Sequence, residues 1–196
     1  YQSGNTQLLA YIIESATGKD LTKYAEEKVW SKIGLEHNLF WSLDKEDGDE
    51  KAFCCMYATA RDYALIGQLI LNKGQWNGQQ LVPEWYMNQM VETPKMKTKE
   101  NVPNMRYGWH IWVYKNRGNP IYYCRGLMGQ YMIAMPHKNR VVVRLGTKRD
   151  AHYAIPENKM NDAVYRSIND EKYGHTIDLY RYLKMSDRIV AQMHDK

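Results

Sequence analysis

The chain has 196 residues, a formal net charge of +5, 44% hydrophobic residues and 25% charged residues, values typical of a globular protein of about one large domain. No apolar run approaches the roughly 20 residues of a membrane-spanning helix. Lys and Arg are spread along the chain without a long run of like charge, so neither a membrane segment nor nucleic-acid binding is expected. The chain begins without Met, and we expect an earlier segment of polypeptide to precede it.

Cysteine and histidine usage argues against a metal or another cofactor. The six histidines are dispersed, and the three cysteines (Cys54, Cys55 and Cys124) lack the spacing of a metal site. Adjacent Cys54 and Cys55 are not expected to form an ordinary structural bridge. We therefore expect neither a metal nor a cofactor.

A short polar stretch opens the chain and runs directly into an amphipathic helix. Residues 1–5 include Tyr1, Ser3 and Asn5, and the helix then ends near Gly18. Its expected buried face consists of Leu8, Leu9, Ile12, Ile13 and Ala16. On one interpretation, Ser3 or Asn5 caps the helix. On the other, the polar cluster serves chemistry, since a helix start favours nearby negative charge.

Three more helices and a turn follow in order. Asp20 is expected to cap a helix over residues 21–32 that Gly34 closes. Residues 35–58 are expected to be irregular, with an exposed acidic loop over 44–50. Thr59 to Asp62 is a capping-box-like start of a third helix that ends at Gly74, with a buried stripe of Tyr63, Ile66, Leu69 and Ile70. A tight turn at 76–79 and a short helix over 84–90, with Pro83 at its start, come next.

After a polar loop at 92–106, the hydrophobic period changes from 3.6 to 2. Strands are predicted over residues 107–114, 121–125, 130–135 and 140–145. The short turns between them require antiparallel pairing. The run of Val141 to Val143 predicts a strand covered on both faces, and helices over 158–168 and 177–193 are expected to cover one face of the sheet. Helices, an antiparallel sheet and further helices make an α+β layer architecture. The sheet has no evident closure at its first edge, which an upstream segment would complete.

Several stretches together resemble the C-terminal part of the serine β-lactamase and penicillin-binding-protein superfamily. The match is to the class C-like branch that includes esterases, amide hydrolases and 6-aminohexanoate-dimer hydrolases. Residues 1–9 resemble that family's tyrosine loop and following helix, and residues 58–64, with Gly67, resemble its A-T-x-R-D helix start. Residues 74–83, 107–109 and 126–136 resemble a turn and strands beside the active site. The order and spacing of these stretches make the resemblance specific.

The resemblance implies an antiparallel sheet flanked by helices with a helical subdomain, incomplete in this chain. Residues 1–106 would be a mainly helical portion that carries the tyrosine loop. Residues 107–196 would supply antiparallel strands and C-terminal helices. Both belong to one catalytic domain whose N-terminal part is absent, and we expect this chain to associate with that missing segment.

The chemistry implied is acyl transfer through a serine, which needs a base and donors for the developing oxyanion. By the resemblance, Tyr1 exchanges protons with the nucleophile and leaving group, and Ser3, where many relatives have Asn, steers the lysine or the substrate carbonyl. The turn at 124–127 falls where K-T-G would be read, but without its Lys and Thr, and Arg125 would replace part of that charge. Residues assigned to the oxyanion site or to substrate binding are Arg125, Gly126, Leu127, Gln130, Tyr107 and Trp109.

The residue chemistry leaves several of these assignments open. Trp109 fits either a core position or a substrate cleft, and Gln130 either a substrate contact or a backbone contact. One literal S-x-x-K occurs, from Ser42 to Lys45, but it follows the tyrosine loop and its Asp- and Gly-rich surroundings disfavour a helix. We interpret it as a chance match and expect the catalytic Ser and Lys upstream of Tyr1.

Two functions remain open. The first is a serine hydrolase that acts on an ester, amide or lactam in a small-molecule or peptide-like substrate. The second is a non-catalytic relative, a binding or accessory module for peptides or cell-wall fragments, which the departures from Asn and K-T-G favour. A periplasmic or cell-envelope location fits the resemblance, but the sequence itself does not determine it.

Overall fold

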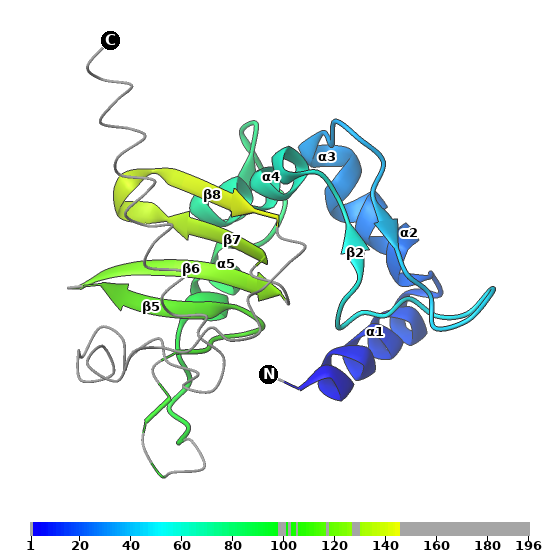
Figure 1. Ribbon diagram of the computed structural model, residues 1–196, viewed down its shortest axis with the longest axis horizontal. Helices are drawn as coiled ribbons and strands as arrows, with labels where there is room; N and C mark the ends of the chain where they lie inside the picture. Colours follow the sequence, from blue (N-terminus) through cyan, green and yellow to red (C-terminus); the bar gives the residue numbers. More distant parts are fainter. Residues whose placement is uncertain are drawn as a thin grey trace, which may run out of the picture.

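The computed structural model describes residues 2–97, 101, 103–104, 106–116, 118–126 and 130–145. Helices and short hairpins come first, and a four-stranded sheet follows (Figure 1). The α+β class expected from the sequence is thus observed. The helices predicted over 158–168 and 177–193 lie outside the described residues.

The first helix, α1 (Ser3–Thr17), starts earlier than predicted. Its N-cap is Gln2, which makes no side-chain capping bond, so Ser3 and Asn5 lie within the helix and the capping interpretation is wrong. Its end is as predicted: Gly18 has φ of 67°, and its N–H donates to the Glu14 carbonyl at 2.8 Å. Left-handed backbone of this kind favours glycine.

The apolar face of α1 is not buried as expected. Leu8, Leu9 and Ile12 are 58%, 45% and 55% exposed, and Ala10 is the buried residue of the helix. Figure 1 shows α1 beside α2, away from the sheet. The described residues therefore leave this aliphatic stripe uncovered.

One predicted helix is broken into three pieces. Residues 21–33 form α2 (Leu21–Ala25), a π-helical segment (Glu26–Trp30) and α3 (Ser31–Ile33). Asp20 occupies the N-cap position without a side-chain bond, and Gly34, with φ of 73°, ends α3 as predicted.

The stretch from 35 to 58 is more ordered than expected. Strand β1 (Phe40–Trp41) pairs antiparallel with β2 (Met56–Tyr57). Cys54 and Cys55 are joined by a disulfide, a vicinal bridge that the sequence did not lead us to expect. At the end of the acidic loop, Glu50 is buried and accepts a hydrogen bond from the Thr22 N–H at 2.9 Å, so the loop is not exposed throughout.

The predicted cap of the third helix is confirmed. Helix α4 (Ala60–Leu71) begins after Thr59, whose Oγ1 accepts from the Asp62 N–H at 3.2 Å and donates to Asp62 Oδ2 at 2.7 Å. Beyond α4, strands β3 (Gln75–Trp76) and β4 (Gln79–Gln80) form the expected hairpin. Asn77 and Gly78 have positive φ there, as a type I′ turn requires. Helix α5 (Glu84–Val91) follows, with Pro83 as its N-cap.

The sheet has the order β5-β6-β7-β8, with every neighbouring pair antiparallel, as the short turns predicted. Its strands are β5 (Trp112–Asn116), β6 (Asn119–Gly126), β7 (Gln130–Met135) and β8 (Arg140–Arg144). The first strand is shorter than predicted, and Pro120 lies inside β6 rather than in the turn.

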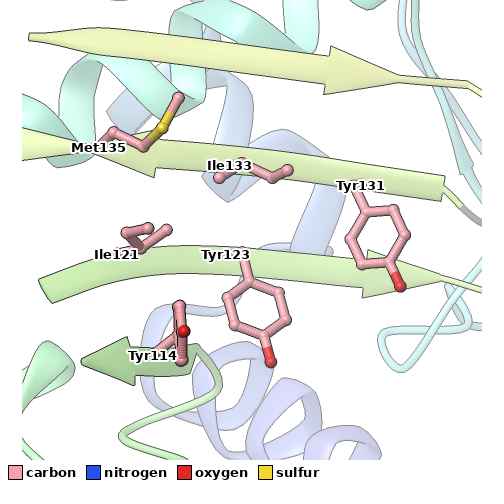
Figure 2. Close-up of a cluster of buried hydrophobic side chains, with 6 residues drawn as sticks. All are labelled: Tyr114, Ile121, Tyr123, Tyr131, Ile133 and Met135. Carbon is pink, nitrogen blue, oxygen red and sulfur yellow. The ribbon is translucent and has the colours of Figure 1, made fainter. Parts of the chain in front are cut away.

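The core is built on both faces of β7. Figure 2 shows the cluster on one face: Tyr114, Ile121, Tyr123, Tyr131, Ile133 and Met135. On the other face, α4 packs against β7 and β8, where a side-chain carbon at Gly67 would meet Val141 and Met132. Val141 to Val143 are only half-buried, so the expectation of full coverage is wrong. Among the described strands, β8 has β7 as its neighbour, and such an edge position leaves it less covered.

Candidate active site

A cavity lies where β6 ends and β7 begins. Gly126, the last residue of β6, pairs with Gln130, the first residue of β7. The cavity has a volume of about 180 Å³ and lies between these strand ends and the start of α4. Its walls include Gly126, Gln130, Cys124, Met132, Val143 and Tyr63. Three residues singled out from the sequence, Arg125, Gly126 and Gln130, therefore line one cavity.

Gln130 lies close over Gly126. A side-chain carbon built at Gly126 would stand 3.3 Å from Gln130 Oε1 and 3.4 Å from Gln130 Cβ. The glycine thus lets the amide side chain of Gln130 approach the backbone of β6. This arrangement presents a polar amide and an accessible strand end at the cavity.

Tyr63 is a wall residue that the sequence placed only in a helix stripe. Its hydroxyl donates to the Met56 carbonyl at 2.6 Å, and burial raises the pKa of the phenol. The hydroxyl is therefore protonated at neutral pH and is engaged as a donor to backbone, which does not suit a general base. Helical periodicity identifies Tyr63 as inward-facing, but nothing in the sequence shows that a cavity lies beside it.

Cys124 also lines the cavity, but its chemistry opposes a role as nucleophile. The residue as a whole is exposed and lines the cavity. Its thiol, however, is surrounded by protein atoms that desolvate it. This burial raises the pKa of Cys124 to about 11. Because the thiolate is the reactive form, very little nucleophile is present at neutral pH.

Arg125 carries positive charge at the same strand end. Its guanidinium carbon lies 4.0 Å from the centre of the Trp112 ring, a cation–π contact. The Trp112 ring in turn contacts Tyr107 edge-on at 4.8 Å and stacks on Tyr123 at 6.2 Å between ring centres. Tyr107 is thus linked to Arg125 through Trp112, and the aromatic ring restricts the orientation of the guanidinium.

The 107–109 stretch forms a tight loop against α5. A side-chain carbon at Gly108 would lie 2.1 Å from the Met90 carbonyl oxygen, so only glycine fits this approach. The Trp109 N–H donates to the same carbonyl at 2.9 Å. Trp109 itself is 41% exposed and packs on Tyr86 at 5.4 Å, and it is not among the residues that line the cavity.

The first turn of α1 meets this loop. Thr6 Oγ1 lies 3.4 Å from His110 Nδ1, one residue after Trp109. In Figure 1 the start of α1 is the end of that helix nearer to β5 and β6. The fold therefore brings the helix turn that carries Ser3 to the loop that follows Tyr107, although no hydrogen bond of Ser3 to the cavity is seen among the described residues. Tyr1 and Leu127 lie outside the described residues.

The literal S-x-x-K does not lie on a helix. The Ser42 N–H donates to the Cys55 carbonyl at 3.0 Å, and Leu43 forms a β-bridge with Glu50. Ser42 and Lys45 are therefore not one helical turn apart. In the part of the chain that the structure describes, no group of three or more His, Cys, Asp or Glu residues is arranged to hold a metal ion. No described helix is long and apolar enough to cross a membrane.

Comparison with known proteins decides the family. The sequence profile of the Beta-lactamase family matches residues 1–164. The chain belongs to the β-lactamase family. The resemblance read from residues 1–9, 58–64 and 126–136 is thereby confirmed.

Relatives of this β-lactamase-family chain include two kinds of hydrolase. A provisionally assigned D-alanyl-D-alanine carboxypeptidase from Escherichia coli K12 is 24% identical, over 94% of this chain and 53% of that protein. A 6-aminohexanoate-dimer hydrolase from Paenarthrobacter ureafaciens is 27% identical, over 76% of this chain and 39% of that protein. The chain thus spans about half the length, or less, of these curated relatives.

Solved structures agree on the β-lactamase-like fold. A provisionally assigned 6-aminohexanoate-dimer hydrolase from Bacillus anthracis superposes with a TM-score of 0.68 at 32% identity, over 76% of this chain and 39% of that one. A provisionally assigned β-lactamase from Bacteroides dorei superposes with a TM-score of 0.55 at 16% identity, over 74% of this chain and 50% of that one, and shows the fold alone. The fold is therefore β-lactamase-like, as the sequence predicted, and the chain spans only part of each matched structure.

Proposed function

We propose that this chain forms one side of the active site of a serine hydrolase that cleaves an ester, amide or lactam by acyl transfer. The observation that carries the proposal is the cavity at the paired ends of β6 and β7, where Arg125, Gly126 and Gln130 meet. The curated relatives are named for the hydrolysis of amide bonds, in a dipeptide terminus or an aminohexanoate dimer. A linear amide in a small or peptide-like substrate is accordingly the first class to test.

Each proposed role follows from the chemistry of serine acylation. A serine hydroxyl needs a base, and the tetrahedral intermediate needs donors aimed at its oxyanion. Tyr1 would move the proton between nucleophile and leaving group, and Ser3 would orient the lysine or the substrate carbonyl. A backbone N–H near Leu127 would supply one oxyanion donor, with Gly126 leaving the strand end open to the substrate. Tyr107 and Trp109 would contact the substrate beyond the scissile bond.

Gln130 and Arg125 have the best structural support among these residues. The Gln130 amide lies over Gly126 at the cavity, within reach of a carbonyl group placed there. Arg125 is held against Trp112, so its charge can attract an anionic end of the substrate without swinging freely. These two residues would replace part of the substrate contacts and positive charge that the K-T-G sequence provides in relatives that have it.

We further propose that the nucleophilic Ser and its Lys come from polypeptide beyond these 196 residues, which associates with this chain. The exposed stripe of Leu8, Leu9 and Ile12 on α1 supports such an association, since apolar patches of this kind commonly mark contact surfaces. The position of Ser42 outside any helix also supports it. Residues 1–106 and 107–196 would then be parts of one catalytic domain, which the packing of α4 on β7 and β8 favours.

Acylation tests this proposal. The protein purified with its natural polypeptide context is treated with a fluorophosphonate probe, and the labelled serine is located by mass spectrometry. We expect one label, on a serine outside residues 1–196 and three residues before a lysine. Label on Ser42 would refute the nucleophile outside residues 1–196, and no label while the protein binds peptides would refute the hydrolase. Binding without acylation would indicate the accessory module instead.

A matched pair of substitutions tests the cavity. Gln130→Ala should lower kcat/KM for a linear amide about tenfold, the equivalent of one lost hydrogen bond to the substrate. Gln79→Ala, in the exposed β4 hairpin strand, makes the same chemical change away from the cavity and should leave kcat/KM unaltered. Equal effects of the two substitutions on kcat/KM would show that Gln130 does not contact the substrate.

A further inference from the structure

The vicinal disulfide Cys54–Cys55 lies in a turn that leads into β2. Both residues are partly exposed, so the turn itself is not sealed from solvent. Cys55 has φ of 67°, a left-handed conformation that L-residues other than Asn and Asp rarely adopt. The short covalent ring restricts this backbone, and without the S–S bond Cys55 would be free to leave it.

Hydrogen bonds tie the turn to β1. The indole N–H of Trp41 donates to the Cys54 carbonyl at 2.9 Å and to the Lys51 carbonyl at 3.0 Å. The Ser42 N–H donates to the Cys55 carbonyl at 3.0 Å. The carbonyls of both cysteines are therefore acceptors whose direction depends on the conformation of the turn.

The same turn contacts two elements of the candidate site. On one side, Gln7 of α1 donates to the Glu50 carbonyl and accepts from the Ala52 N–H, each at 3.0 Å. On the other side, the carbonyl of Met56, the residue after Cys55, accepts the Tyr63 hydroxyl at 2.6 Å. Tyr63 lines the cavity, and Gln7 lies one turn of helix after Ser3. The disulfide turn thus connects α1 with the cavity wall.

We propose that Cys54–Cys55 is a reversible thiol–disulfide exchange site, reduced by a small dithiol, whose state controls the turn between α1 and Tyr63. A thiolate of the dithiol attacks one cysteine sulfur, breaks the S–S bond and forms a mixed disulfide. Its second thiol then displaces that cysteine and closes a cyclic disulfide. Two electrons and two protons pass from the dithiol to the protein, which gains two thiols.

Reduction removes the covalent restraint on Cys55. Its backbone then moves toward extended conformations, which turns the Cys55 carbonyl away from Ser42 and the Met56 carbonyl away from Tyr63. The bonds from Gln7 to the turn loosen with it. This exchange chemistry does not require the chain to be a hydrolase, and its readouts below do not use enzyme activity.

Alkylation with iodoacetamide and intact mass measurement test the exchange. Within residues 1–196 of the native protein we expect at most one carbamidomethyl group, on Cys124, and after dithiothreitol two more, mapped to Cys54 and Cys55. Cys124→Ser is the matched control, and its number of carbamidomethyl groups should rise from none before reduction to two after it. Labelling of Cys54 or Cys55 without reductant would overturn the disulfide. Failure of the native protein to gain label after reduction would overturn the exchange.

Hydrogen exchange tests the coupling. On reduction, the amide of Ser42 should exchange about tenfold faster, because it loses its hydrogen bond to the Cys55 carbonyl. The amide of Asn72, bonded to the Gln68 carbonyl at the end of α4, should not change and excludes global unfolding. A Cys54→Ser, Cys55→Ser double variant should reproduce the reduced pattern without reductant. Unchanged exchange at Ser42 in both samples would overturn the control of the turn by the disulfide.

Discussion

Replacement of Gly67 by Ala probes the packing that forms the cavity wall. A side-chain carbon at this position would lie 2.5 Å from Val141 Cγ1 and 3.0 Å from Met132 Sδ, too close without movement of α4 or the sheet. Overpacking of this kind costs about 1–3 kcal/mol. Alanine in a helix interior recovers about 1 kcal/mol over glycine. The cost of overpacking is therefore expected to exceed the gain in helix propensity, and the free energy of unfolding should fall by roughly 1 kcal/mol.

Urea denaturation measures this difference. For an m-value of about 2 kcal/mol/M, the midpoint should fall by about 0.5 M. Gly4→Ala is the control, because Gly4 lies in α1 with no atom within 4 Å of the added carbon. That variant keeps the propensity gain without the clash and should be as stable as the wild type or slightly more stable. If Gly67→Ala matched Gly4→Ala, the close packing of α4 on β7 and β8 would be refuted.

Two further outcomes follow from titratable groups. Asp62, only 1% exposed, accepts hydrogen bonds at 2.7 Å from the Glu36 N–H and Thr59 Oγ1, so Asp62→Ala should lower the free energy of unfolding by about 3 kcal/mol in urea. Burial acts to raise the pKa of Asp62, but the hydrogen bonds outweigh it and the pKa is lowered. The contribution of Asp62 to the free energy of unfolding is therefore complete above the unfolded-state pKa, and it is lost as pH falls through the folded-state pKa. The Tm difference from Asp62→Ala should accordingly shrink below about pH 4, and a constant difference would contradict the assigned bonds. For Cys124, whose pKa is about 11, the alkylation rate should rise about tenfold per pH unit without a plateau below about pH 10, whereas a plateau near neutral pH would contradict its desolvation.

Local signals in the sequence predicted many of the elements. Thr59 and Asp62 satisfy each other within one turn of α4, and Asn77 and Gly78 suit a two-residue hairpin, so neither depends on distant residues. The antiparallel order of β5 to β8 followed from short turns that leave no room for a crossover. Gly18 and Gly34 ended their helices for the same local reason, a left-handed conformation that glycine adopts without steric cost.

Burial was predicted less well than secondary structure. The alternation of apolar residues marked one face of α1, but whether that face is covered depends on what packs against it. Glu50 looked like part of a solvated acidic run, yet the free N–H of Thr22 at the start of α2 gives its carboxylate a buried partner. The two residues are far apart in the chain, and no periodicity links them.

The candidate site, too, was predicted in part from the sequence, and the rest of it depends on the tertiary structure. The sequence by itself determined the membership in the β-lactamase family, the strands that carry Arg125 and Gln130, and the misfit of Ser42 as a nucleophile. Those features depend on neighbouring residues and on motif order. Only the tertiary structure decided that Arg125 stacks on Trp112, that Trp109 does not line the cavity, and that Tyr63 is part of its wall. Such contacts join residues from separate elements, and they exist only once α4 packs on the sheet and the strands pair in register.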